Sequence, residues 1–481
     1  MGDLLMISMA ALAWTGIMII AGVVLRAKVP FLRNNLVPAS VIGGVIGFIV
    51  MNLGFITDCT VGEFGDIANL LWIFTFANMG VTLAAKKETV KTADGQSFRQ
   101  KLANSQFSGI CGMGFIWVIP YAFSGLIGFL VLQVIGKYFG MPAIHGLQLP
   151  FAFAQGPGQS VNYGGMMEAN GVADAVQVGV TFAAMGFLVA FLIGVPYAKK
   201  GIKKGLAPYS GKIGESMLKG LYEPDEQEFY GKQTTHPGNV DTLAFHVALV
   251  GIAWVGGMYI GKLWALVPGY IGTLFSGFLY LNSMLCGYVI RWIIGKLGLS
   301  KYLDRGTQIH LSGFCIDMMV TSAFMAISLE VVGKWLVPIL ILVLITTVFT
   351  YIITRYFGER MGGKYGFERS LGVWGAMTGT NATGQALVRM VDPDRKTTVL
   401  EEMGPMNVIN VPACYVVMPA VIAYSAGEIS TTALFVSLIG VGVAFMAAML
   451  VTGVWGKKTY DYRKGELYYS LDDETEQKAA Q

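Results

Sequence analysis

Two short polar runs interrupt long apolar stretches of this chain: Gln-Gly-Pro-Gly-Gln-Ser at residues 155–160 and Thr-Gly-Thr-Asn-Ala-Thr-Gly-Gln at residues 378–385. Hydrocarbon offers no hydrogen-bond partner to backbone amides and carbonyls. A non-helical segment therefore persists at membrane depth only where protein or a water-filled cavity surrounds it. Paired interruptions at matching places in two halves of a chain indicate the binding site of a membrane carrier. The two runs thus predict paired helix breaks that bind a solute.

Composition supports a membrane location for the surrounding stretches. Of 481 residues, 54% are hydrophobic and 13% are charged, against about 25% charged in a soluble domain. The mean hydropathy is +0.58, and the 62 glycines are typical of closely packed membrane helices. The five cysteines and four histidines are scattered without metal-binding spacing. We therefore predict an all-α polytopic membrane protein with no resident metal centre.

We expect eleven spanning helices and two shorter, broken segments. The spans are predicted at 4–25, 36–56, 65–85, 108–136, 174–198, 241–263, 269–291, 309–330, 335–355, 403–424 and 431–455. The broken segments are predicted at 143–166 and 370–388. The first span is not a signal peptide, because Asp3 precedes it and basic residues follow it.

The distribution of basic residues orients these spans. With the N-terminus outside and the C-terminal tail in the cytoplasm, all but Lys137, Lys262 and Lys334 of the 34 Lys and Arg residues fall in cytoplasmic segments. This bias is the one expected of cytoplasmic loops. It also requires each broken segment to leave the membrane on the side from which it entered, because crossing would invert the pattern. We therefore predict two re-entrant loops, the first entering from outside and the second from the cytoplasm.

Five spans per half is an odd number, so the second half starts on the opposite face and must be inverted relative to the first. The predicted organisation is a five-helix repeat at 1–198 with its re-entrant loop at 143–166, a cytoplasmic linker at 199–240, an inverted five-helix repeat at 241–425 with its loop at 370–388, and an extra helix with a cytoplasmic tail at 426–481. Each loop lies between the fourth and fifth helices of its repeat.

The side chains in and beside the two runs are uncharged donors and acceptors. Helix N-termini at such breaks attract carboxylates, and unwound carbonyls with hydroxyls can ligate Na+. These groups suit a small anionic or zwitterionic substrate. The candidate substrate-binding residues are Gln155, Gly156, Gly158, Gln159, Ser160, Asn162, Thr378, Gly379, Thr380, Asn381, Thr383 and Gln385. The alternative is that the small residues only permit close helix packing.

Polar residues within other predicted spans are candidates for a sodium site. They are Asp317, Asn78, Asn407 and Asn410. A carboxylate within a span is costly and usually functional, although Asp317 could instead form a salt bridge toward Arg305 or Lys301, or pair with a group at the helix end. Each asparagine could equally make an interhelical hydrogen bond.

Several motifs are missing from the sequence. It contains no Gly-x4-Gly-Lys-Ser/Thr, no His-Glu-x-x-His and no Gly-x-Ser-x-Gly, so nucleotide hydrolysis and intramembrane hydrolysis are not expected. We therefore expect a gradient-driven carrier rather than an enzyme, with a coupling ion in place of a cofactor and no nucleic-acid partner. A channel or uniporter stays open as an alternative, because re-entrant loops also build selectivity filters.

The order of elements resembles the bacterial sodium/glutamate symporter family and, more remotely, the 2-hydroxycarboxylate carriers. The resemblance rests on a Pro-headed second helix with Pro38, Gly43 and Gly44, on a glycine-bearing re-entrant segment in each half, and on the five-plus-five inverted plan; it covers about residues 1–425. The first run departs from the family's Gly-Gly-x-Gly-x-Gly pattern, and the second is richer in Thr and Asn.

The resemblance implies a function and a setting. It implies Na+-coupled symport of glutamate or a related amino acid or carboxylate across the bacterial cytoplasmic (inner) membrane. It also implies a homodimer in the lipid bilayer that works by an elevator-like, alternating-access mechanism, in which the loop-bearing part slides against a static scaffold. A proton-coupled carrier of another small organic acid is the alternative within the same class.

Overall fold

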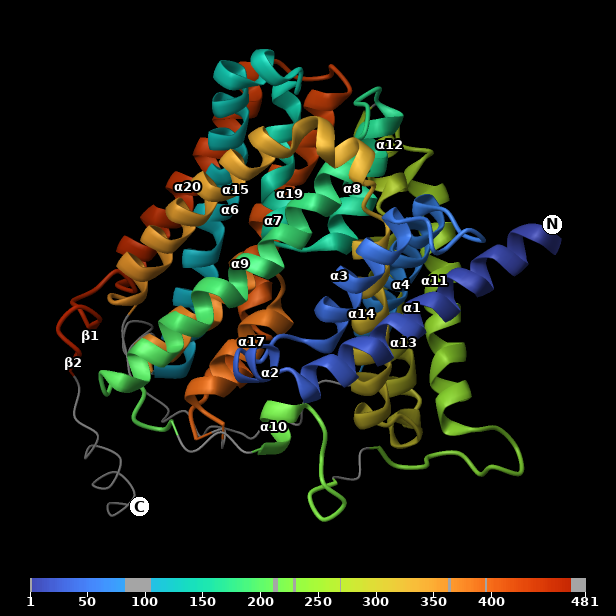
Figure 1. Ribbon diagram of the computed structural model, residues 1–481. Helices are drawn as coiled ribbons and strands as arrows, with labels where there is room; N and C mark the ends of the chain where they lie inside the picture. The colour runs from blue at the N-terminus through green and yellow to red at the C-terminus, as the bar shows by residue number, and fades with distance from the viewer. Residues whose placement is uncertain are drawn as a thin grey trace. The chain divides into compact units, whose positions relative to one another are not determined.

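The computed structural model describes residues 2–82, 105–210, 215–227, 231–268, 270–361, 365–393 and 396–468, and these residues are predominantly helical (Figure 1). The described strands are β1 (Tyr460–Asp461) and β2 (Glu466–Leu467), which pair antiparallel in a short hairpin. Part of the predicted cytoplasmic tail, beyond residue 468, and parts of the predicted linker at 199–240 lie outside the described residues.

Eight helices within the described residues are long and apolar enough to cross a membrane. They cover Met9–Lys28, Val61–Val81, Phe107–Phe139, Ala175–Lys203, Thr242–Trp264, Leu329–Gly358, Val399–Ser425 and Thr431–Thr452. Each overlaps a predicted span. The chain is therefore a polytopic α-helical membrane protein.

Three predicted spans take a different form. The span predicted at 36–56 is the 14-residue helix α3 (Ala39–Asn52). The span predicted at 269–291 is divided at Phe278 into α12 (Tyr270–Gly277) and α13 (Leu279–Lys296). The span predicted at 309–330 is α14 (Arg305–Met325). Its Gln, His, Ser and Asp residues lower its hydropathy, so it is not among the eight helices that are apolar enough to cross a membrane. A continuous helix at 269–291 was the wrong expectation, because hydropathy does not report a local change of backbone angles.

The helices form two compact units, each built from both halves of the chain. Unit 1 takes its described residues from Met1–Thr92, Pro157–Ala169 and Lys219–Leu329; unit 2 takes them from Ala93–Gly156, Asn170–Leu218 and Glu330–Gln481. The predicted sequence repeats are therefore not the packing units. The chain passes from unit 2 to unit 1 between Gly156 and Pro157, inside the first polar run.

Unit 1 contains α1 (Gly2–Lys28), α2 (Pro30–Asn34), α3, α4 (Val61–Val81), α8 (Pro157–Ala169), α11 (Thr242–Trp264), α12, α13, η2 (Leu299–Tyr302) and α14. Glycines allow its helices to approach closely: a Cβ at Gly43 would lie 2.3 Å from the carbonyl oxygen of Met18, and one at Gly80 would lie 2.9 Å from the Cα of Gly287. Packing through small residues is the usual way in which membrane helices associate.

Unit 2 contains α6 (Ser105–Phe139), η1 (Ala143–Gln148), α7 (Leu149–Phe153), α9 (Ala175–Lys203), α15 (Leu329–Gly358), α16 (Gly366–Met377), α17 (Asn381–Val391), α18 (Val399–Glu402), α19 (Met406–Ser425), α20 (Thr431–Thr452) and the β-hairpin. The short α10 (Glu215–Lys219) lies where the chain returns to unit 1. The predicted extra helix, α20, packs against α6 and α19 (Figure 1). Its Gly442 lies against the ring of Phe123.

Candidate functional site

The first polar run is a turn between two helices. α7 ends at Phe153, and the amide of Gly156 donates to the carbonyl of Ala152 at 3.2 Å. Gly156 has a φ of +86°, a left-handed conformation that glycine adopts without steric cost. Pro157 then begins α8, where its fixed φ suits the first helical turn and its missing N–H is not needed. Glycine and proline at this break thus suit the backbone conformations that the turn and the start of α8 require.

The second polar run is a break closed by threonines. The Thr378 hydroxyl donates to the carbonyl of Trp374 at 2.8 Å, at the end of α16. Thr380 is extended, with φ −143° and ψ 172°, and precedes α17. Its amide donates to the Thr383 hydroxyl at 3.3 Å. Hydroxyl side chains satisfy backbone groups that lack helical partners at helix ends. Gln385 is half-buried one turn further along α17.

The two arms of the second break pack directly against each other. A Cβ at Gly375 of α16 would lie 2.6 Å from the Cα of Gly384 of α17, and one at Gly384 would lie 2.3 Å from the carbonyl oxygen of Gly372. On its other side α16 is attached to α9, because the Trp374 indole donates to the carbonyl of Ala190 at 3.2 Å. The hairpin α16–α17 is therefore a closely packed element of unit 2.

Within unit 2 the two breaks lie side by side on α9. A Cβ at Gly156 would lie 2.8 Å from the Cγ2 of Thr380 and 3.5 Å from the carbonyl oxygen of Gly379. A Cβ at Gly186 of α9 would lie 2.7 Å from the Thr378 carbonyl oxygen and 3.1 Å from that of Phe153. The glycine on α9 thus lets the chain of each break approach the helix. Residues more than 220 positions apart in sequence share this region.

Two acceptor oxygens at the adjacent breaks have no partner among the described residues. They are the buried side-chain oxygens of Gln155 and Asn381. The amide nitrogen of Gln155 is used, since it donates to the Cys414 sulfur at 3.2 Å. Asn381 is the first residue of α17, so its oxygen lies at the helix end where backbone amides lack helical partners. The region therefore offers a ligand two unpartnered acceptor oxygens beside the N-terminus of a helix.

The rest of the first run belongs to unit 1. Gly158 lies on the indole of Trp72 in α4, since a Cβ there would be 2.2 Å from a ring carbon. Gln159 and Ser160 are buried. The Oε1 of Gln159 and the Nδ2 of the half-buried Asn162 have no partner within the described part of the chain. Further along α8, the hydroxyls of Tyr163 and Tyr280 are 2.7 Å apart.

The candidate sodium ligands are divided between the units. In unit 1, Asn78 donates to the Gln308 carbonyl at 2.7 Å and to the Ser312 hydroxyl at 2.8 Å, which joins α4 to α14. Its own side-chain oxygen is buried without a partner among the residues described. Asp317 is exposed on α14, with a hydrogen bond from Ser40.

In unit 2 the two remaining candidates differ from each other. With its nitrogen facing the carbonyls, the Asn410 amide donates to Gly114 at 3.0 Å and Met406 at 3.2 Å. This is the interhelical hydrogen bond named above as the alternative. Asn407 is exposed. Over the described ranges, no group of three or more His, Cys, Asp or Glu residues could hold a metal ion.

The hairpin α16–α17 at the second break, called the second hairpin below, has a buried ion pair at its base that was not predicted from the sequence. Arg369, in the first turn of α16, contacts Glu402 of α18 through two hydrogen bonds of 2.7 Å, and both side chains are fully buried. Thr398 donates to the same carboxylate at 2.6 Å. The charge pattern had placed Arg369 in a cytoplasmic segment. Only the fold brings its partner, 33 residues away, into contact.

The neighbouring Glu368 is fully buried, and neither of its carboxyl oxygens has a hydrogen-bonding partner in the described residues. The pKa of Glu368 is raised to about 8, mainly by burial; the charge of Arg369 opposes this shift and the charge of Asp392 contributes to it. Asp392 itself accepts hydrogen bonds from the Thr397 hydroxyl and amide at 2.6 and 2.8 Å. The base of the hairpin thus contains a carboxyl group suited to holding a proton near neutral pH.

A family model described as the sodium/glutamate symporter matches residues 125–390, more than half of the chain and a range that includes both breaks. The chain belongs to the sodium/glutamate symporter family. It is 22% identical over 258 residues to sodium/glutamate symporters of Escherichia coli (strain K12) and Shigella flexneri, over 54% of this chain and 58% of each relative. The match thus spans little more than half the length of these curated relatives. The predicted family is confirmed, and it is a family of transporters rather than enzymes. These comparisons lend no support to the resemblance to the 2-hydroxycarboxylate carriers.

Proposed function

We propose that this protein is a secondary active transporter that couples Na+ entry to the uptake of glutamate or a related amino acid or carboxylate. Membership of the symporter family supports the class of reaction. The observation that carries the proposal is the pair of unpartnered oxygens, on Gln155 and Asn381, at two helix breaks that lie against each other on α9. A buried acceptor without a partner costs about 1–3 kcal/mol, so a bound ligand that supplies donors recovers this cost.

The chemistry of the region matches an amino acid. The amides in the first turn of α17 and the positive end of its dipole would hold the substrate carboxylate. The oxygens of Gln155 and Asn381 would accept hydrogen bonds from its ammonium group or ligate Na+, a hard cation that binds oxygen ligands. Gly156 lets the two breaks pack closely, since a Cβ there would lie 2.8 Å from the Cγ2 of Thr380, and so keeps the two oxygens in one region. Asn78, Asp317, Asn407 and Asn410 are kept as candidate sodium ligands in this proposal.

We also propose an elevator-like mechanism in which one unit moves relative to the other. The support is the composition of the units: the whole second hairpin belongs to unit 2, whereas the first run changes unit between Gly156 and Pro157. A backbone that must change direction at one residue is best served by glycine. A homodimer in the bacterial inner membrane, with its N-terminus outside, completes the proposal.

Uptake by purified protein in proteoliposomes tests this function. An inward Na+ gradient should drive concentrative, saturable uptake of labelled glutamate, and replacing Na+ by K+ should abolish it. Asn381→Ala should reduce uptake at least tenfold without changing the yield of folded protein. Asn170→Ala, outside the two breaks, should leave uptake unchanged. Equal uptake in K+ and in Na+, or full activity of Asn381→Ala, would contradict the proposal.

Proton coupling is a second candidate, and Glu368 is the observation that favours it. A fully buried carboxyl group without hydrogen-bonding partners is neutral when protonated and costly when ionised. In the same liposomes, an inward proton gradient without Na+ should then drive uptake, and Glu368→Gln should abolish that component. Uptake that depends only on Na+, and equally in Glu368→Gln, excludes this alternative.

A further inference from the structure

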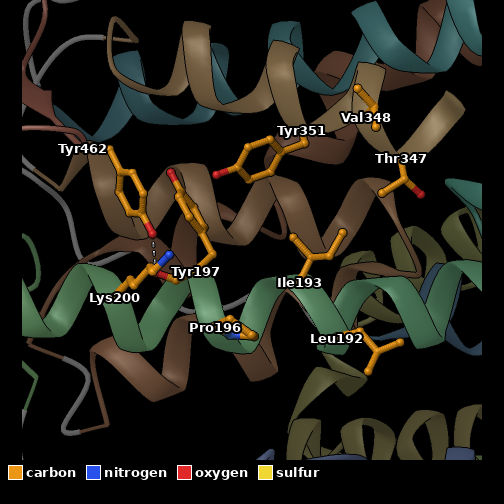
Figure 2. Close-up of a pocket in the computed structure, with 9 residues that line it drawn as sticks. All are labelled: Leu192, Ile193, Pro196, Tyr197, Lys200, Thr347, Val348, Tyr351 and Tyr462. Carbon is orange, nitrogen blue, oxygen red and sulfur yellow. Dashed lines mark hydrogen bonds between the residues drawn. The ribbon is translucent and has the colours of Figure 1, made fainter. Parts of the chain in front are cut away.

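A pocket of about 370 Å³ lies in unit 2 between α9 and α15, away from the two breaks in sequence. Figure 2 shows that its two ends differ in chemistry. Lys200 lies at one end with Tyr197 and with Tyr462, which belongs to the turn of the β-hairpin, whereas Leu192 and Val348 lie at the other end. The pocket is thus apolar at one end and cationic at the other.

The apolar end is open along two membrane-spanning helices. Leu192 of α9 is 62% exposed and Val348 of α15 is 50% exposed, and both helices are among the candidate spans. Exposed aliphatic side chains on a spanning helix contact lipid hydrocarbon. The neighbouring Thr347 also lines the pocket, and its buried hydroxyl oxygen has no partner among the described residues. This end therefore suits an acyl chain with a polar group near it.

The cationic end carries a positive charge that is not paired with any carboxylate of the described residues. Lys200 is exposed at the last turn of α9, and no acidic side chain of the described part of the chain lies within salt-bridge distance of it. Arg355 lies over the Tyr462 ring at 5.0 Å. The nearby Glu359 is already shared between Arg355 at 3.6 Å and Lys458 at 2.9 Å. An anionic group at this end would therefore be attracted rather than repelled.

We propose that this pocket binds an anionic phospholipid, with the phosphate at Lys200 and an acyl chain along Leu192 and Val348. Eight residues of α-helix separate Leu192 from Lys200, a rise of about 12 Å, which suits a headgroup and the upper part of an acyl chain. Basic pockets between spanning helices near the membrane surface are suited to anionic headgroups. A soluble anion would use only the cationic end and an uncharged lipid only the apolar end, whereas an anionic phospholipid uses both.

Native mass spectrometry and thermal unfolding of the full-length protein, delipidated and titrated with lipid, test the proposal. Phosphatidylglycerol should bind and stabilise the protein more than phosphatidylcholine of the same chain length. Lys200→Gln should weaken phosphatidylglycerol binding about fivefold or more, and Lys199→Gln, its exposed neighbour outside the pocket, should not. Equal binding of the two lipids, or equal effects of the two lysine substitutions, would overturn the proposal.

Two further experiments distinguish phospholipid binding from binding of a soluble anion. Val348→Trp should fill the apolar end and weaken phosphatidylglycerol binding. Leu344→Trp, at a more exposed position one turn away on α15 and outside the pocket, should leave phosphatidylglycerol binding unchanged. Inorganic phosphate alone should stabilise the protein no more than chloride does. A phosphate effect as large as that of phosphatidylglycerol, and lost in Lys200→Gln, would show a site for free phosphate and overturn the lipid assignment.

Discussion

The two helix breaks look alike in sequence but are built differently. At the second break, α16 and α17 return on each other and pack through Gly375 and Gly384 inside unit 2. At the first break, α7 belongs to unit 2 and α8 to unit 1, where Gly158 lies on Trp72. The second break is a hairpin stabilised by its own packing, whereas the first is a turn between two separately packed arms.

In the proposed mechanism, this difference gives the two breaks distinct mechanical roles. A hairpin packed through glycines and fixed at its base by a buried ion pair moves as one element. A single left-handed glycine between arms of different units is where a change of direction is least costly. In the proposed mechanism the second break therefore travels intact, and the first break bends. The following substitutions separate the two roles, in order of decreasing expected effect.

The largest effect should come from the base of the second hairpin. Glu402→Gln leaves the fully buried Arg369 without its carboxylate, which should cost about 3–5 kcal/mol of stability. The yield of monodisperse protein and its apparent Tm measure this. Glu401→Gln, at the exposed neighbouring position, should leave both unchanged. Equal stability of the two variants would show that the ion pair does not hold the hairpin.

The pH dependence of stability should reveal Glu368 at the same base. Its folded pKa of about 8 lies above the ordinary value of 4.5, so the folded state binds more protons than the unfolded state between these values. Stability should therefore fall as pH rises from about 5 to 8, by up to about 1.4 kcal/mol per pH unit. Unfolding of Glu368→Gln, which cannot ionise, should lack this component. Parallel pH profiles for the two proteins would exclude a proton on Glu368.

Packing within the second hairpin should matter more than packing at an open glycine of α8. Gly375→Ala places a Cβ 2.6 Å from the Cα of Gly384, so the arms must separate, at about 1–3 kcal/mol. Gly165→Ala in α8 meets no atom within 4 Å and should be neutral or slightly stabilising, as alanine favours helices. Thermal unfolding compares the two. Equal tolerance would remove the distinction between a packed hairpin and a separate arm.

A smaller stability effect is expected at the turn of the first break. Gly156→Ala forces alanine to a φ of +86°, at about 1–2 kcal/mol, and places its Cβ 2.8 Å from Thr380. Gly171→Ala is the matched control, with a φ of +89° and no atom within 4 Å. Both variants should lose the stability that corresponds to the strained positive φ, but only Gly156→Ala should also lose glutamate uptake. Equal uptake by the two variants would show that the first turn does not act in transport.

The sequence predicted those features that depend on local composition. The apolar spans follow from hydropathy, and both breaks follow from Gly, Pro and Thr in apolar surroundings. The division at Phe278 was missed although Ser276 and Gly277 precede it, because the apolar residues on either side indicate one continuous span and a Ser-Gly pair is also tolerated within membrane helices. The pairing of Arg369 with Glu402 was also missed, because the positive-inside pattern assigns an arginine to a side of the membrane but not to a partner. The two units, which each combine both halves of the chain, depend on contacts that no single segment encodes.

The central claim is that Gln155 and Asn381, from different breaks, belong to one binding site. A double-mutant cycle on Na+-dependent glutamate binding, measured by isothermal titration calorimetry, tests it most directly. Gln155→Leu and Asn381→Leu should each raise the Kd at least tenfold, and the double variant should be less impaired than the product of the two, with a coupling of about 0.5–3 kcal/mol. Single variants that bind like the wild type, or effects that multiply without coupling, would contradict a shared site at the two breaks.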